Sequence, residues 1–193
     1  MFVASLSIPE VKLIEPRVFK DDRGYFFESF NDKFFRENVC DTTFIQDNES
    51  KSIKNTVRGI HWQRAPYAQS KLVRVAKGAV YDFAVDIRLG SPTFGAVCGA
   101  VLSEENHWQL FIPRGFAHGF IALWDENVFQ YKCDNLYNKE AEAAIAWDSV
   151  GIKWNHLLKE GESFILSDKD KNHPTLENID KTLLFDYNFN YYE

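Results

Sequence analysis

The sequence predicts an all-β domain, an antiparallel sandwich or barrel of many short strands, and two observations carry this prediction. Aromatic residues are abundant, with 17 Phe, 8 Tyr and 5 Trp in 193 residues, and they suit pleated, half-buried surfaces better than a helical bundle. Strand-like runs also recur at regular spacing with turn residues between them, which is typical of sandwiches and barrels. The mouth or lumen of such a barrel can hold a small ligand.

The N-terminal part is expected to hold one strand and one helix. An aromatic-rich strand over 24–30 follows the turn-like residues 21–23. Asn31 is in position to cap a short helix through Val39, with two adjacent phenylalanines facing inward. An isolated edge strand near the N-terminus would also need a pairing partner.

The middle of the chain is richest in strand signals. Two runs, 72–76 and 79–88, flank Lys77-Gly78 and predict a β-hairpin, because large apolar residues alternate along the second run. Further strands, with turn residues between them, are expected over 94–102, 107–112, 116–124 and 127–133. Residues 140–147 favour helix by composition, but we interpret them as a strand because large apolar residues alternate with alanines. Beyond about residue 150 the pattern weakens and short helices are expected.

Composition sets limits on architecture and partners. The length fits one domain over 1–193, with a barrel core over about 20–150 and a C-terminal segment packed on it. The formal net charge of −6 argues against a nucleic-acid or anionic-membrane partner. The three cysteines lack metal-like spacing, and neither a signal-like N-terminus nor a long apolar run is visible. These features indicate a cytoplasmic protein with buried thiols.

Three segments carry more polar residues than a core requires. In chain order, their notable side chains are Gln46, Asn48, Arg58, His61 and Lys71, then His118, then Tyr131, Glu142, Lys169 and Asp170. Taken singly, each has an ordinary structural explanation: histidine and tyrosine are often hydrogen-bonded core residues, and a strand lysine usually reaches solvent. Only their joint order and context favour a site.

These segments belong to a longer pattern that runs from Asp21 to Asp170. It includes, in one order, DDRGYFFES, QDNESKS, RGIHWQ, KLVRVAKG, VDIRLGSPTFG, IPRGFAHGF, YKCDNLY and LSDKD. In this pattern the chain resembles the dTDP-4-dehydrorhamnose 3,5-epimerase family of cupin-like sugar-nucleotide epimerases. The resemblance implies a double-stranded β-helix (jelly roll) with a few short helices. It also implies a homodimer, a dTDP-sugar ligand, and neither metal nor other cofactor.

The resemblance implies a role for each polar residue. His61 would be the base, Asp170 would orient and polarise it, Tyr131 would be the opposing acid and Lys71 would stabilise an enolate. The sugar and nucleotide would be bound by Arg23, Glu28, Gln46, Asn48, Arg58, His118, Glu142 and Lys169. The implied reaction inverts C3 and C5 of dTDP-4-dehydro-6-deoxy-D-glucose to give dTDP-4-dehydro-L-rhamnose, for dTDP-L-rhamnose supply.

These residue types suit a 4-keto sugar. C3 and C5 both flank the carbonyl, so removal of either proton forms an enolate on O4. An imidazole has a pKa near working pH, and a carboxylate fixes its tautomer. An ammonium aimed at O4 stabilises the charge that develops there, and arginine grips a diphosphate with paired hydrogen bonds. A phenol can return the proton from the other ring face.

Three alternatives remain open. A metal-dependent cupin enzyme could use His61, His118 and Glu142 as ligands, although Trp62-Gln63 follows His61 where the usual close histidine pair would stand. A non-catalytic sugar-nucleotide binding module would explain the aromatics and arginines, but not the base, acid and lysine together. A relative that inverts only C3 or only C5 would use much the same residues.

Geometry provides further expectations. Strict alternation would put Arg58 and His61 on opposite strand faces because they are three residues apart. A common site therefore requires a bulge or twist near Gly59. His61 should lie within hydrogen-bond reach of Asp170, and it should face Tyr131 across a cavity.

Overall fold

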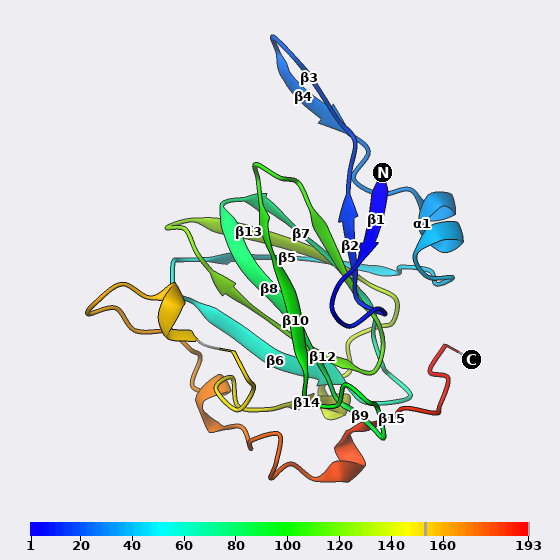
Figure 1. Cartoon of the computed structure of the whole chain (residues 1–193), viewed down its shortest axis with the longest axis vertical. Helices are drawn as coiled ribbons and strands as arrows, with labels where there is room; N and C mark the ends of the chain where they lie inside the picture. The colour runs from blue at the N-terminus through cyan, green and yellow to red at the C-terminus, as the bar shows by residue number, and fades with distance from the viewer. Residues whose placement is uncertain (153, 193) are drawn as a thin grey trace.

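The computed structural model describes residues 1–152 and 154–192, and its centre consists of two antiparallel sheets (Figure 1). The larger sheet contains, in spatial order, β1 (Phe2–Ser5), β2 (Lys12–Glu15), β11 (Gln109–Ile112), β7 (Lys71–Lys77), β13 (Asn127–Cys133) and β5 (Gln46–Ser52). The smaller sheet contains β10 (Val97–Ser103), β8 (Ala79–Asp86), β12 (Phe116–Ala122), β6 (Val57–Gln63) and β14 (Glu142–Ala144).

Short elements decorate the two sheets. Two small pairs are formed by β3 (Val18–Asp21) with β4 (Gly24–Phe27), and by β9 (Arg88–Leu89) with β15 (Phe185–Asp186). The helices are α1 (Asp32–Asn38) and the 3₁₀ turns η1 (Lys139–Ala141), η2 (Trp154–Leu157), η3 (Asp170–Asn172) and η4 (Lys181–Leu183). The all-β prediction with a few short helices is confirmed. No helix in the described part of the chain is long and apolar enough to cross a membrane.

Apolar side chains from both sheets meet in the interior. One buried cluster joins Val73 and Phe129 of the larger sheet to Ala84 and Phe120 of the smaller sheet. A second cluster lies on the other face of the smaller sheet, where the C-terminal segment contributes Ile179 among others. Strand β8 is consequently buried along nearly its whole length on both faces. The alternation seen in its sequence therefore separates two cores, not a core from solvent.

The predicted hairpin at Lys77-Gly78 is wrong, although both of its strands exist. β7 pairs with β11 and β13, whereas β8 pairs with β10 and β12 in the other sheet. Only Gly78 separates the two strands, and a Cβ added there would lie 2.2 Å from the carbonyl oxygen of Glu126. The glycine therefore permits close backbone contact where the chain crosses between sheets, and it is not a hairpin turn.

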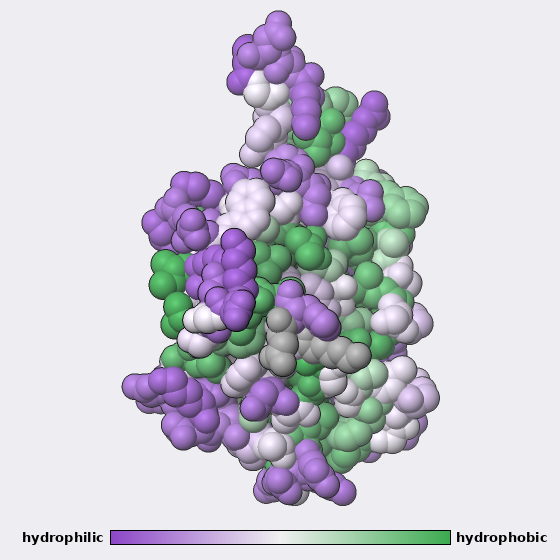
Figure 2. All heavy atoms as spheres, turned by 60° about the vertical axis from the view of Figure 1, so that its left-hand side comes forward, coloured by the Kyte–Doolittle hydropathy of each residue, from purple (hydrophilic) through white to green (hydrophobic). Residues whose placement is uncertain are grey.

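The N-terminal predictions hold in part. Helix α1 begins after Asn31, whose side chain accepts a hydrogen bond from the Phe34 backbone N–H, and Phe35 is buried beneath the helix. The strand expected over 24–30 ends at Phe27 and pairs with β3 across the predicted turn. This β3–β4 hairpin stands out from the body of the protein, with a hydrophilic tip (Figures 1 and 2). Residues 140–147 form a 3₁₀ turn and a short strand instead of one continuous strand.

Candidate active site

A bulge places Arg58 and His61 on one cavity. His118 of β12 pairs with His61 of β6, and Phe120 pairs with Arg58, so one residue of β12 lies opposite two residues of β6. Gly59 lies in this bulge with φ +119°, a conformation that residues with a Cβ rarely adopt. The predicted irregularity at Gly59 is confirmed, and both side chains line the same hollow.

The site is a polar lumen that both sheets line. Three residues, His61 from the smaller sheet and Lys71 and Tyr131 from the larger one, line two adjoining hollows of about 270 and 300 Å³. The other predicted residues in these hollows are Gln46, Asn48, Arg58, His118, Glu142, Lys169 and Asp170. His61 and Tyr131 thus approach the cavity from opposite sheets, as expected.

His61 and Asp170 form a close pair. The distance from His61 Nε2 to Asp170 Oδ1 is 2.6 Å across 109 positions of sequence, so the expected contact is confirmed. Burial would raise the pKa of Asp170, but the hydrogen bond and charge of His61, together with Ser167, lower it below its ordinary value. The carboxylate is therefore ionised and accepts a hydrogen bond from His61 in the tautomer that carries its proton on Nε2. That tautomer leaves Nδ1 as an acceptor.

Lys71 and Tyr131 share the desolvated part of the lumen. Burial lowers the pKa of Lys71, and the charges of Cys133, Asp82 and Glu142 partly oppose that shift. Burial also raises the pKa of the Tyr131 phenol. The lysine Nζ lies 6.0 Å from the centre of the Tyr131 ring. The phenol consequently stays protonated, and it can donate a proton beside the Lys71 amine.

A second histidine–aspartate pair forms the floor of the site. His118 Nε2 lies 2.9 Å from Asp82 Oδ2, and both residues are buried on neighbouring strands β12 and β8. Burial raises the pKa of Asp82, which the charge and hydrogen bond of His118 and the charge of Lys71 only partly counter. The other oxygen of this carboxylate, Oδ1, is buried without a hydrogen-bond partner. The sequence contained no signal for Asp82, which reads as an ordinary polar residue of an alternating strand.

The mouth of the lumen is organised by Glu142. Its carboxylate contacts Lys169 Nζ at 2.6 Å and accepts a hydrogen bond from the Tyr137 hydroxyl at 2.9 Å. The Tyr137 backbone N–H donates in turn to the side chain of Gln46, which also bonds to Asn48. Tyr137 is not one of the predicted site residues, although it belongs to the YKCDNLY motif of the family pattern. Glu142 is paired with Lys169, and His118 is paired with Asp82. His61, His118 and Glu142 therefore do not form the three-ligand metal site that the metal-dependent alternative requires.

The structure does not bring Arg23 and Glu28 to this lumen. Arg23 occupies the tip of the β3–β4 hairpin, pairs with Asp21 and leaves 90% of its side chain exposed. Glu28 follows the same hairpin and is exposed. Neither residue lines either hollow of its own chain.

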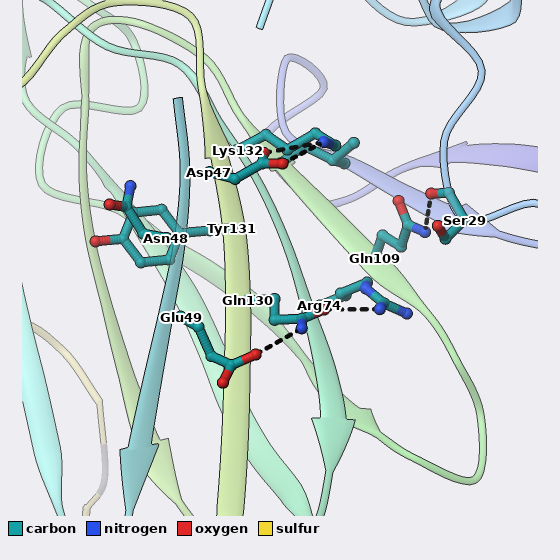
Figure 3. Close-up of a pocket in the computed structure, with 10 residues that line it drawn as sticks. Ser29, Asp47, Asn48, Glu49, Arg74, Gln109, Gln130, Tyr131 and Lys132 are labelled. Atoms are coloured by element: carbon teal, nitrogen blue, oxygen red, sulfur yellow. Dashed lines mark hydrogen bonds and ion pairs between the residues drawn. The ribbon is translucent and has the colours of Figure 1, made fainter. Parts of the chain in front are cut away.

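A separate hollow lies on the other face of the larger sheet. Figure 3 shows Tyr131 and Asn48 projecting to one side of strands β13 and β5, while Lys132, Glu49 and Arg74 project to the other. That outer hollow of about 390 Å³ is lined by charged groups already paired with their neighbours, including Lys132 with Asp47 and Arg74 with Gln130. His61, Lys71 and Asp170 do not line it, so the chemistry is assigned to the lumen.

Fold and site together define a cupin-type β-barrel with a histidine–aspartate base and a tyrosine on opposite walls of its lumen. The family model for dTDP-4-dehydrorhamnose 3,5-epimerase matches residues 5–178. The chain therefore belongs to the dTDP-4-dehydrorhamnose 3,5-epimerase family, as its motifs indicated.

Individual relatives agree with this assignment. The chain is 51% identical over 175 residues to the dTDP-4-dehydrorhamnose 3,5-epimerase of Shigella flexneri, covering 89% of this chain and 94% of that one. Among solved structures, the dTDP-6-deoxy-D-glucose-3,5-epimerase of Legionella pneumophila in complex with dTDP-4-keto-L-rhamnose matches with a TM-score of 0.88 and 43% identity, covering 97% and 99% of the two chains. A 3'-monoepimerase of Streptomyces bikiniensis in complex with dTDP-quinovose matches with a TM-score of 0.86 and 30% identity, over 95% and 92%. The predicted jelly-roll fold is confirmed by these structures.

Proposed function

We propose that the chain inverts C3 and C5 of dTDP-4-dehydro-6-deoxy-D-glucose and thereby supplies dTDP-L-rhamnose synthesis. One observation carries the proposal: His61, held by Asp170, and Tyr131 line one lumen from opposite sheets, with Lys71 beside them. Family membership provides the substrate class. The described cysteines are free thiols, which supports a cytoplasmic location.

The proposed reaction uses the side chains in sequence. His61 Nδ1 takes the proton from C3, and the electron pair moves onto O4 as an enolate. Lys71 donates to O4, so charge is stabilised where it develops. Tyr131 then delivers a proton to the opposite ring face. His61 loses its proton to solvent and Tyr131 regains one from solvent, after which the same steps at C5 complete the product. Because Asp170 is already ionised and in contact, the imidazolium is stabilised as it forms.

Proton exchange with solvent tests this proposal directly. The protein is incubated with dTDP-4-dehydro-6-deoxy-D-glucose in heavy water, and NMR records which carbons acquire deuterium and which invert. We expect exchange and inversion at both C3 and C5. A substrate that binds but exchanges at neither carbon would establish a binding module instead of an enzyme.

Inversion of C3 alone is the second candidate function. A solved relative of the same fold carries the description of a 3'-monoepimerase, so this scaffold is compatible with single inversion. The same NMR experiment separates the two, because a C3-specific enzyme would leave the C5 proton unexchanged over many turnovers.

We also propose that the chain acts as a homodimer in which each β3–β4 hairpin completes the partner's site. Arg23 is remote from its own lumen, and the exposed fractions of Phe19 and Phe26 on this hairpin are 51% and 71%. Strand β1 also ends the larger sheet with one unpaired edge, which invites pairing with another chain.

Mixing two defective variants tests the exchange of hairpins. Arg23→Ala and His61→Asn proteins are each expected to be nearly inactive, the first for substrate binding and the second for chemistry. If the hairpin serves the partner, heterodimers regain one site with an intact base and an intact arginine. Unfolding and refolding the two together should then restore about a quarter of wild-type activity. No recovery, in a mixture that sedimentation shows to be dimeric, would mean that each hairpin serves its own chain.

A further inference from the structure

A second imidazole lies against the base pair of the site. His173 Nε2 lies 3.7 Å from Asp170 Oδ1, and the rings of His173 and His61 meet edge to face with centroids 5.8 Å apart. Nothing assigned so far uses this side chain. Its Nε2 atom is buried and has no hydrogen-bond partner, which is costly for a ring nitrogen unless something else occupies the space beside it.

The position of His173 follows from local structure. Asp170 begins the 3₁₀ turn η3 and His173 caps its end, and in a 3₁₀ helix residues three apart lie on the same face. The Asp170 backbone N–H donates to Ser167 Oγ, and the carbonyl of the following Pro174 accepts from Ala146 N–H at 2.8 Å. Hydrogen bonds therefore fix both ends of segment 170–174, which contacts His61.

We infer that His61, Asp170 and His173 form a binding site for Zn²⁺ that switches the epimerase off. This inference rests on the proposed function for its effect on activity, but not for the binding itself. One ligand atom from each of the three residues lies within 4.8 Å of the other two. Two imidazole nitrogens and one carboxylate oxygen form a donor set that zinc prefers, with an open fourth position for water.

The observed spacing needs little adjustment to accept the ion. Zinc ligands stand about 2.1 Å from the metal, so three of them in tetrahedral geometry lie about 3.4 Å apart. His61 and Asp170 would separate slightly from 2.6 Å, and His173 would approach Asp170 slightly from 3.7 Å. The hard ions Mg²⁺ and Ca²⁺ favour sets made of oxygen atoms, so they should not bind here.

Coordination disables the base through the tautomer of its ring. A neutral imidazole that binds a metal through Nε2 carries its single proton on Nδ1. His61 would therefore present an N–H donor to the lumen where catalysis requires an acceptor. The same ion takes the Asp170 carboxylate that would otherwise stabilise the imidazolium. Zinc is thus an inhibitor at this site, and the reaction itself does not require it.

Metal titration of the complete, EDTA-treated protein tests the site independently of activity. Co²⁺ is titrated as a spectroscopic substitute for Zn²⁺, and the ions bound per chain are counted. We expect one Co²⁺ ion per chain, with a visible absorption spectrum typical of nitrogen and oxygen ligands. The sulfur-to-cobalt charge-transfer band that coordination by Cys133 of the same lumen would produce should be absent. His173→Gln should weaken binding by about tenfold or more. His156→Gln, which removes an exposed histidine elsewhere, should not change it.

Zinc inhibition is then measured within each variant as the ratio of deuterium exchange with and without the ion. Wild type and His156→Gln should lose exchange at the same zinc concentration and recover it with EDTA, whereas His173→Gln should require about tenfold more zinc. His173→Leu serves as a second variant if the glutamine variant does not fold. Equal zinc sensitivity in the His173 variants, a sulfur band, or bound metal without inhibition would each overturn the inference. A wild type that binds cobalt as described but lacks epimerase activity would instead refute the proposed function.

Discussion

The lumen contains two histidine–aspartate pairs that look alike and differ in what they can do. His61 contacts Asp170 of the 3₁₀ turn η3, which lies far along the chain, whereas His118 contacts Asp82 on the adjacent strand of its own sheet. The side chain of His61 is 28% exposed to the cavity, compared with 9% for His118. The pKa of Asp170 is lowered, because hydrogen bonds outweigh burial, and the pKa of Asp82 is raised, because burial outweighs its partner.

The difference shows that residue type alone does not make a general base. A usable base needs an ionised partner on one ring nitrogen and an open cavity at the other. His61 satisfies both conditions. The buried His118–Asp82 pair suits orientation of the ligand and of the cavity floor, and it has little exposed surface from which to exchange protons.

Removing the imidazole from each pair should give the largest contrast. His61→Asn is expected to lower both deuterium exchange and inversion by about 10³-fold or more, because no enolate forms. His118→Asn should retain exchange at a reduced rate and act mainly through KM. The measurement is NMR in heavy water at saturating substrate. Comparable loss of exchange in both variants would remove the functional distinction between the pairs.

Tyr131→Phe should separate exchange from inversion. The variant keeps nearly all of the packing but loses the phenolic proton, so the inverted product should fall by about 10²-fold. His61 can still remove a proton and return it to the same face, and some exchange at C3 or C5 should therefore persist. If this variant epimerises at the wild-type rate, water or another group supplies the proton and Tyr131 is only a wall of the lumen.

The two carboxylates should differ in their effect on the rate. Asp170→Asn is expected to keep the fold and to lose about 10²-fold in kcat, since an amide cannot stabilise the imidazolium. Asp82→Asn should lose about tenfold or less in kcat, because Asp82 supports His118, which orients the ligand. Steady-state kinetics on both purified variants makes the comparison, with circular dichroism to verify folding. A full-rate Asp170→Asn variant would eliminate Asp170 from the mechanism.

The same substitutions should have opposite pH dependence of stability. A lowered pKa means that Asp170 stabilises the fold above its ordinary value of 3.8 and loses this contribution as pH falls through the folded-state pKa. The stability deficit of Asp170→Asn should therefore shrink below about pH 4. A raised pKa means that the contribution of Asp82 is complete below 3.8 and is lost as pH rises. The free energy of unfolding of Asp82→Asn, measured with urea at each pH, should therefore rise relative to that of wild type as pH increases above about 4.

Chelation should produce the smallest effect. Each step of the proposed reaction belongs to a side chain, so activity should survive dialysis against EDTA without measurable loss. Metal content is checked by mass spectrometry. Activity that disappears with the metal and returns with iron, nickel or zinc would favour the metal-dependent alternative, and it would contradict the inhibitory role of zinc as well.

Some elements were predictable from local pattern and others were not. Helix α1 and strand β13 follow directly from a cap residue and an alternating run, and β13 begins and ends where it was expected. Strand β5 was missed because its sequence, QDNESKS, contains no apolar alternation. It lies at a sheet edge with only β13 as a partner, so its backbone hydrogen bonds, and not buried side chains, define it as a strand.

By itself, the sequence determined the class of fold, the family and most of the lumen, because strand periodicity and ordered motifs are local properties of the chain. Only the tertiary structure decided which strands pair. The glycine between β7 and β8 resembles a hairpin turn until the neighbouring backbone of Glu126 is in place. The tertiary structure also decided which carboxylate pairs with which histidine, and it brought His173 beside His61. The physical reason is that burial and contacts between residues more than a hundred positions apart set the ionisation of a group.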